Sequence, residues 1–179
     1  MQVFQEVRQE APNAIAPYDA FNPAARACYW KQANEGLFSQ GVDAWWCDGT
    51  EPFESDWKGA TKPEPEERMR INTAEAKRYL DPEQVNAYSL HHSEAMYTGQ
   101  RQATGAKRVI NLTRSAYLGQ QRYATVTWSG DVSATWETLR KQIADGLNFC
   151  MTGLPYWTTD IGGFFVKRKP DLWFWDNGF

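Results

Sequence analysis

The protein has 179 residues, of which 42% are hydrophobic, and a net charge of −3 from 19 basic and 22 acidic side chains. These values exclude a disordered chain and offer no basic surface for nucleic acid or an anionic membrane. Nine tryptophans, about one residue in twenty, favour an aromatic surface that binds a ligand.

The cysteines, histidines and N-terminal residues suggest no metal site, disulfide or targeting signal. Cys28, Cys47 and Cys150 have no C-x-x-C spacing, so buried free thiols are expected. The adjacent His91 and His92 point to different sides of a regular element and are expected to be structural or surface residues. No run of 18 apolar residues occurs, and the first 17 residues do not have the pattern of a secretion signal.

The first predicted elements are a helix and a strand. Asn22 as cap and Pro23 at the first helical position begin the helix, and Gly41 ends it. Its apolar residues recur every four positions: Ala25, Tyr29, Ala33 and Leu37. Residues 42–47 form a nearly continuous apolar run, typical of a strand covered on both faces. The polar stretch at about 49–81 is predicted to be a long loop that serves a site.

Two helices and three strands are predicted further along the chain. A helix is expected over 83–102, with an apolar face formed by Val85, Tyr88, His92, Ala95 and Gly99. Strands are expected at 108–113, 123–128 and 155–159. Ser133 can cap a helix with a stripe formed by Trp136, Leu139, Ile143 and Leu147. Alternating strands and helices predict an α/β fold whose parallel sheet is either doubly wound or closed as a barrel.

Charged residues follow the predicted strands. In both architectures ligands bind at the carboxyl ends of the strands. The four residues at these ends are Asp48, Arg114, Asp131 and Asp160. No dinucleotide-binding glycine motif accompanies them, because the pair Gly162-Gly163 lacks the remaining glycines. An aspartate at a strand end is also common as a turn or helix cap, and that alternative applies to each aspartate taken alone.

The aromatic residues near these carboxylates favour a sugar site. Trp46, Trp128 and Trp157 flank them, and aromatic faces pack against the C–H surfaces of sugars. Trp46 and Asp48 are two positions apart and therefore point the same way from a strand. Glycoside hydrolysis needs two carboxyl groups, and Asp48 and Asp131 are the natural pair.

At these residues the sequence resembles glycoside hydrolase family 31, which contains α-glucosidases and α-xylosidases. The matching stretches, in the family's order, are VDAWWCDGTEPF (42–53), NLTRSAYLGQQRYATVTWSGD (111–131) and GLPYWTTDIGGF (153–164). The resemblance covers about residues 18–165 and implies a (β/α)8 TIM barrel. Residues 1–179 would then form a partial catalytic domain with about strands 3 to 7. Because a complete barrel takes about 250 residues, we expect a fragment of a larger enzyme.

The resemblance also implies a role for each site residue. Asp48 would be the nucleophile and Asp131 the general acid/base of a retaining α-glycosidase that acts by double displacement. Arg114 would bind substrate hydroxyls and keep the nucleophile ionised. The residues implied to contact the sugar are Trp46, Arg114, Trp128, Asp160 and Phe164. The resemblance implies an oligosaccharide substrate, no metal and no cofactor.

The form of the nucleophile block, W-W-x-D-x-T-E-P, is closer to bacterial α-xylosidases that act on xyloglucan oligosaccharides than to α-glucosidases. An α-xylosidase is therefore expected, with an α-glucosidase of the same family as the alternative. Glu51 in this block either contacts substrate or orients the loop.

Two other classes of protein remain as alternatives. A non-catalytic sugar-binding module would not need both Asp48 and Asp131, and an unrelated doubly wound enzyme would need a phosphate loop. The chain alone is expected to be inactive without the remainder of its parent protein, which is either periplasmic or secreted if it is exported.

Overall fold

The computed structural model describes residues 18–51 and 80–166, together with residues 64, 66–67, 70–71 and 74. Within these residues the chain forms one four-stranded sheet with β1 (Trp45–Cys47), β2 (Asn111–Thr113), β3 (Thr125–Trp128) and β4 (Trp157–Thr158). All three neighbouring pairs are parallel, and each strand lies beside its predecessor. The predicted parallel α/β sheet is confirmed. This unbroken order is typical of a barrel, because a doubly wound sheet reverses its strand order at a switch point.

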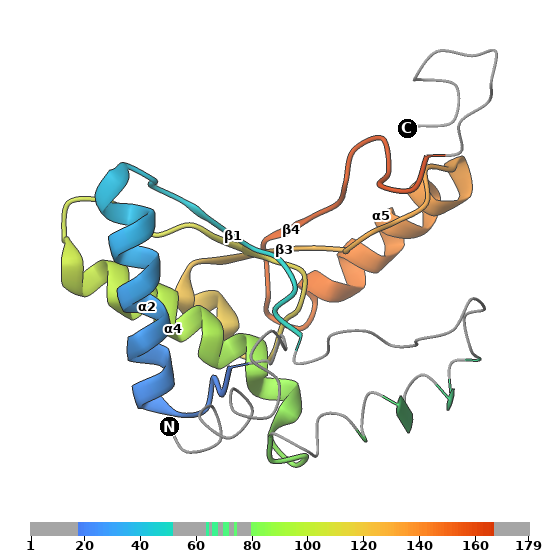
Figure 1. Ribbon diagram of the computed structural model, residues 1–179. Helices are drawn as coiled ribbons and strands as arrows, with labels where there is room; N and C mark the ends of the chain where they lie inside the picture. The colour runs from blue at the N-terminus through green and yellow to red at the C-terminus, as the bar shows by residue number, and fades with distance from the viewer. Residues whose placement is uncertain are drawn as a thin grey trace.

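Three helices pack around the sheet in the described part of the chain: α2 (Pro23–Gly36), α4 (Tyr88–Ala103) and α5 (Trp136–Cys150). Figure 1 shows α2 and α4 side by side at one end of the sheet, while α5 lies near β4 at the other. Short 3-10 turns occur at Phe38–Gln40, Val85–Ala87 and Gln120–Tyr123. No helix of the described residues is long and apolar enough to cross a bilayer.

Helix α2 begins as predicted but ends earlier. The Asn22 side chain accepts a hydrogen bond from the Ala24 N–H, and Pro23 is the first helical residue. The helix ends at Gly36, and a 3-10 turn continues to Gln40 before Gly41, which has φ +104°. The predicted stop at Gly41 therefore ends the 3-10 turn and not the α-helix.

The described core lies mainly between β1 and the two helices α2 and α4. One cluster joins Trp45, Met96 and Val109, and the ring of Trp30 packs against it. A second cluster joins Ala20, Leu80 and Tyr88. Helix α4 buries Tyr88, His92, Ala95 and Gly99, so its predicted apolar face is confirmed for the helical part.

Each strand is shorter than its apolar run. β1 begins at Trp45 instead of Val42, and Tyr123 lies in a 3-10 turn before β3. Ala124, with φ +57°, interrupts the chain between that turn and the strand. β1 is also not covered on both faces within the described residues, since the side chain of Trp46 is 70% exposed. Apolar runs predicted the positions of the strands better than their ends.

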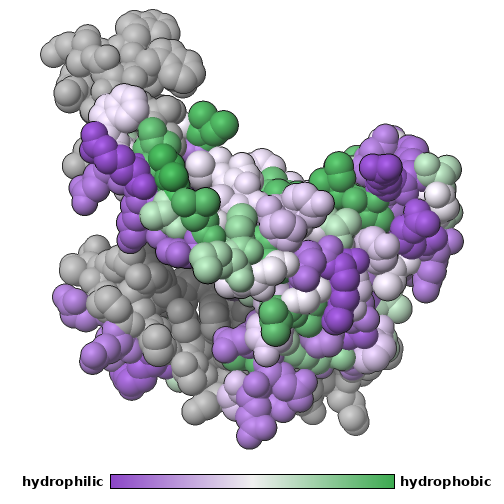
Figure 2. Space-filling view, turned by 180° about the vertical axis from the view of Figure 1, so that it is seen from behind, coloured by the Kyte–Doolittle hydropathy of each residue, from purple (hydrophilic) through white to green (hydrophobic). Residues whose placement is uncertain are grey.

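Helix α5 differs from its predicted packing. Thr135, not Ser133, caps it by accepting a hydrogen bond from the Thr138 N–H. It packs on β4 through Gly146, over which the Trp157 ring lies. The predicted stripe is therefore mostly turned away from the sheet, and its exposed members are Trp136, Ile143 and Leu147. Figure 2 shows hydrophobic surface on the part of the molecule that contains α5.

The expectation of buried thiols was wrong for two of the three cysteines. Cys28 and Cys150 are exposed because their helices contact the rest of the described chain through other residues. Cys47, on β1, is half-buried, and burial raises the pKa of its thiol to about 12. Most of the predicted long loop at 49–81 lies outside the described residues, but residues 66–67, 70–71 and 74 within it are helical, so the prediction of a continuous loop is wrong there.

Candidate functional site

The strand register brings the predicted site residues to one face of the sheet. Trp46 is paired with Leu112, and Leu112 with Val126, so these three side chains point to the same face. Two positions further along the three strands come Asp48, Arg114 and Trp128. The rings of Trp46 and Trp128 meet edge to face, with centroids 5.9 Å apart.

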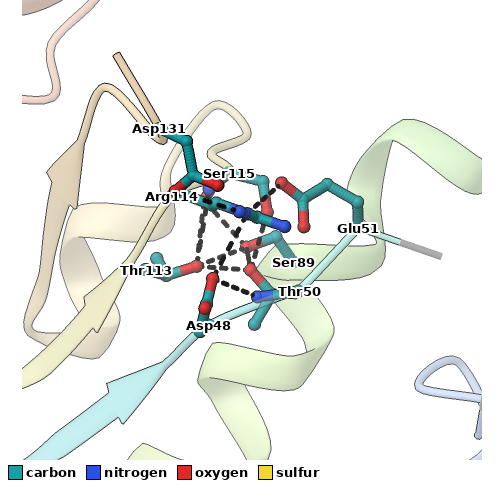
Figure 3. A network of polar contacts seen from close by, with 9 residues as sticks. Asp48, Thr50, Glu51, Ser89, Thr113, Arg114, Ser115 and Asp131 are labelled. Carbon is teal, nitrogen blue, oxygen red and sulfur yellow. Dashed lines mark hydrogen bonds and ion pairs between the residues drawn. The ribbon is translucent and has the colours of Figure 1, made fainter. Parts of the chain in front are cut away.

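Arg114 links three carboxylates at this edge (Figure 3). Its Nε lies 2.9 Å from Glu51 Oε1 and 3.3 Å from Asp48 Oδ1. Its Nη1 lies 3.6 Å from Asp131 Oδ1. Residues that follow three different strands therefore meet at one guanidinium, as the positions at the strand ends predicted.

The two aspartates are held by their local backbone. Asp48 Oδ1 accepts a hydrogen bond from the Gly49 N–H at 2.8 Å, and the Asp48 side chain is 59% exposed. Asp131 follows Gly130, which has φ +76° and lies close to the Arg114 side chain. A side chain at position 130 would be strained in this conformation, so glycine fits the turn that directs Asp131 toward Arg114.

Asp160 is a third aspartate near this edge. Partial burial, followed by the negative charges of Asp131 and Asp48, raises the pKa of its carboxyl group. Repulsion of this kind requires that the three carboxyl groups lie near one another. Contacts through Arg114 join Asp48 and Asp131, and the place of Asp160 beside them stays a prediction.

The segment with Asp160 and Phe164 is fixed to the chain that follows Asp131. The N–H groups of Phe164 and Phe165 donate to the Val132 carbonyl at 2.8 and 3.0 Å. The Ala134 N–H in turn donates to the Phe165 carbonyl at 3.1 Å. The Phe164 ring packs edge to face on Phe165 and stays more than half exposed at the surface.

Trp157 lies away from the other candidate residues. It is paired with Thr127 on the face of the sheet that α5 covers, and its ring packs on Phe149 at 4.7 Å between centroids. Its expected place beside the carboxylates is therefore wrong. Trp157 is paired with Thr127, the neighbour of Trp128, so the side chains of Trp157 and Trp128 point to opposite faces of the sheet. The sequence does not define this register.

A buried group of hydroxyls lies beneath Arg114, and sequence reasoning missed it. Thr50 Oγ1 contacts the hydroxyls of Thr113 and Ser115, the two neighbours of Arg114. Ser89 on α4 and the side chain of Gln120 extend the group. The sequence feature that could have indicated this group is the threonine and the serine on either side of Arg114, Thr113 and Ser115. Among the residues that the structure describes, no three His, Cys, Asp or Glu side chains form a group suited to a metal ion.

Comparisons with known proteins agree with this arrangement. The family described as "Glycosyl hydrolases family 31 TIM-barrel domain" matches residues 2–174. An α-xylosidase of Saccharolobus solfataricus is 44% identical over 149 residues, which cover 82% of this chain and 19% of that protein. Proteins named α-glucosidases match at lower identity.

Comparison with solved structures also finds members of glycoside hydrolase family 31. A family 31 α-xylosidase from Xanthomonas citri superposes with a TM-score of 0.70 at 42% identity, covering 84% of this chain and 16% of that one. A family 31 α-xylosidase from a soil metagenome, complexed with xylose, has a TM-score of 0.64 at 28% identity, covering 91% and 24%. This chain thus spans a quarter or less of the length of these relatives. The chain belongs to glycoside hydrolase family 31, whose TIM-barrel domain it matches over residues 2–174.

Proposed function

We propose that this chain is the catalytic part of a retaining α-glycoside hydrolase, with Asp48 as nucleophile and Asp131 as general acid/base. The geometry that supports this best is the link through Arg114, whose single guanidinium reaches both carboxylates at the ends of β1 and β3. In retaining enzymes the two carboxyl groups are about 5 to 5.5 Å apart. A shared guanidinium partner is consistent with so short a separation.

In the first step Asp48 attacks the anomeric carbon while the bond from that carbon to the glycosidic oxygen breaks. Asp131 donates its proton to the departing oxygen. In the second step Asp131 removes a proton from water, whose oxygen attacks the same carbon and releases Asp48. Two inversions at one carbon give net retention. Arg114 orients both carboxylates for these steps.

The aromatic residues form the walls of the proposed sugar subsite. Trp46 and Trp128 meet edge to face on the side of the sheet that carries Asp48. Trp46, which is 70% exposed, can pack against the C–H face of a sugar, and Trp128, which is 4% exposed, supports the Trp46 ring from below the surface. Asp160 would accept hydrogen bonds from sugar hydroxyls beside Asp131, and Phe164 would close the subsite. For Glu51, the contact with Arg114 favours a role in orienting the loop over direct contact with substrate.

The substrate we propose is a xyloglucan-type oligosaccharide with a terminal α-xylosyl group. The 44% identity to an α-xylosidase and the form of the block around Asp48 support this choice. An α-glucosidase of the same family is the second candidate, because α-glucosidases are also among the matches. Parallel kinetics on aryl α-xylosides and α-glucosides distinguish the two.

We further propose that the 179 residues are a partial barrel, completed by strands from the rest of the protein. The four described strands are half of the eight in a complete barrel. Trp46, exposed in the described part of the chain, would then point into the barrel. The isolated 179-residue chain is expected to show no turnover on aryl α-xylosides, whereas the complete protein should be active.

Mechanism-based labelling tests the proposed function directly. The complete protein that carries this chain is incubated with a fluorinated α-xylosyl fluoride, which forms a slowly hydrolysed glycosyl-enzyme, and the modified peptide is identified by mass spectrometry. Modification of Asp48 is the expected result. Modification of Glu51 or Asp43, or absence of hydrolysis of any aryl α-glycoside, would contradict the assignment.

A further inference from the structure

Thr50 is buried although its neighbours belong to an exposed turn. Its exposed fraction is 4%, while Asp48, two positions earlier, is largely exposed. The hydroxyl of Thr50 lies 2.6 Å from Ser115 Oγ and also contacts Thr113 Oγ1. Figure 3 shows the side chain of Thr50 among the hydroxyls below Arg114, on the opposite side from the carboxylates of Glu51 and Asp131.

Two of the hydrogen-bond partners of Thr50 are Thr113 and Ser115, the residues on either side of Arg114. One side chain from the turn after β1 is therefore hydrogen-bonded to the side-chain hydroxyls of the two residues that flank Arg114 in the sequence. The turn contributes two carboxylates, Asp48 and Glu51, to that same guanidinium, at 3.3 and 2.9 Å. Thr50 thus links the turn after β1 to the segment 113–115 by hydrogen bonds, next to the ion pairs that Arg114 forms with Asp48 and Glu51.

Helix α4 supports this connection from behind. Ser89 Oγ donates to the Ser115 carbonyl at 2.8 Å and lies 3.3 Å from Thr50 Oγ1. The side-chain amide of Gln120 donates to Ser89 Oγ at 3.0 Å and to Ser93 Oγ at 3.1 Å. Ser89, Ser93 and Gln120 are buried. The group is therefore fixed to a helix and screened from water.

A buried hydroxyl group of this kind is sensitive to the loss of one member. Each hydroxyl has one proton to donate, so removing the Thr50 hydroxyl leaves Thr113 and Ser115 with fewer partners than they need. The segments can restore hydrogen bonds only by moving or by admitting water. Either change would alter how Asp48 lies relative to Arg114.

We propose that Thr50 is a positioning residue, whose hydroxyl holds the turn carrying Asp48 and Glu51 in register with Arg114. This inference rests on the proposed function of Asp48. It assigns a kinetic role to a residue that does not touch the sugar. The effect should appear in the rate of attack by Asp48 and not in the binding of substrate.

The test uses four variants of the complete protein and an aryl α-xyloside. Thr50→Val has nearly the same shape without the hydroxyl, whereas Thr50→Ser keeps the hydroxyl. Thr98→Val removes an exposed hydroxyl that donates to the Glu94 carbonyl on α4 and has no other hydrogen bond within the described residues, and it serves as the matched control. Ser89→Ala weakens the same group from the helix side and replaces Thr50→Val if that variant does not fold.

Thr50→Val is expected to lower kcat by about 10- to 100-fold, the scale for small misplacement of a reacting group, with KM changed much less. Labelling of Asp48 by the fluorinated inactivator should slow in parallel. Thr50→Ser should restore most of the rate, and Thr98→Val should match the wild type. Ser89→Ala should change the same two quantities in the same direction.

Three results would overturn the inference. They are wild-type kcat in Thr50→Val, equal impairment of Thr50→Ser and Thr50→Val, and an effect confined to KM. An inactive wild-type protein would overturn the proposed function, and this inference with it. An active wild type with an unaffected Thr50→Val would overturn the inference alone.

Discussion

Gly163 lies directly against Ala134, and a β-carbon built on Gly163 would come within 2.5 Å of the Ala134 Cα. This contact fixes the segment that carries Asp160 and Phe164 to the chain that leaves Asp131. Gly163 also has φ +77°, a conformation that residues with a side chain rarely adopt. The close packing of the segment with Asp160 and Phe164 on the chain after Asp131 therefore requires a residue without a β-carbon at position 163.

Gly163→Ala is predicted to reduce activity by separating these two segments. We expect kcat/KM on an aryl α-xyloside to fall by at least about tenfold, because misplacement of a few tenths of an ångström to 1 Å reaches that scale. Gly153→Ala is the matched control, since Gly153 has φ +85° but a β-carbon added there would lie more than 4 Å from the surrounding atoms of the described residues. Equal loss of activity in both variants would attribute the effect to backbone strain and not to the contact with Ala134.

Arg114→Lys is predicted to remove most of the activity although it keeps the positive charge. A lysine ammonium is a single point of charge and cannot present Nε to Asp48 and Nη1 to Asp131 at the same time. A loss of about 100-fold or more in kcat/KM is expected on the scale of misplaced catalytic groups. Arg122→Lys, an exposed change in the same chain segment, should have no effect. Retention of activity in Arg114→Lys would show that charge alone is sufficient.

Asp131→Ala is predicted to affect substrates according to their leaving groups. Natural oligosaccharides need a proton on the departing oxygen, so their hydrolysis should fall by about 100-fold or more, the usual scale of general acid catalysis. Aryl glycosides with good leaving groups should still form the glycosyl-enzyme, which then accumulates because water lacks its base. Added azide, which needs no base, should raise turnover and give an α-glycosyl azide. Untouched activity on both substrate types would rule out the acid/base role.

Protein stability is predicted to depend on pH through His92. This side chain is buried on α4, its Nδ1 lies 2.7 Å from the Tyr18 hydroxyl, and burial lowers the pKa of the imidazole to about 4. The unfolded chain takes up a proton near pH 6.5, and the folded chain does so only near pH 4. Neutral His92 therefore makes its full contribution to the free energy of unfolding above pH 6.5. This contribution is lost as the pH falls toward 4, and the loss is about 3 kcal/mol in total.

Urea unfolding between about pH 4.5 and 7.5, the range that brackets this titration, measures the dependence. The free energy of unfolding of the wild type should decrease toward low pH more steeply than that of His92→Gln, which cannot titrate. Parallel curves for the two proteins would show that His92 is not the source of the dependence.

The sequence allowed a good prediction of the order of elements and of the residues at the strand ends. Asp48, Arg114 and Asp131 were found because charged residues directly after apolar runs in a parallel sheet must meet at one edge. Trp157 was misplaced, because its side-chain direction depends on a register that a short apolar run does not define. The buried hydroxyls around Thr50 were missed, since serine and threonine have no periodic signal and their burial depends on segments distant in sequence.

Helix α5 shows a further limit of pattern reading. The spacing of Trp136, Ile143 and Leu147 correctly indicated a helix with an apolar stripe. Spacing alone does not say which neighbour an apolar stripe meets, and within the described residues α5 uses Gly146 to contact the sheet.

The single guanidinium of Arg114 is outnumbered by the three carboxylates that contact it, which come from Asp48, Glu51 and Asp131. Such a surplus of negative charge favours a substrate that becomes cationic as it reacts, and glycoside cleavage passes through an oxocarbenium-like transition state. A sugar mimic with a protonated ring nitrogen should therefore bind this site more tightly than a neutral mimic of the same shape. High ionic strength should reduce this difference in affinity, because salt screens the charges.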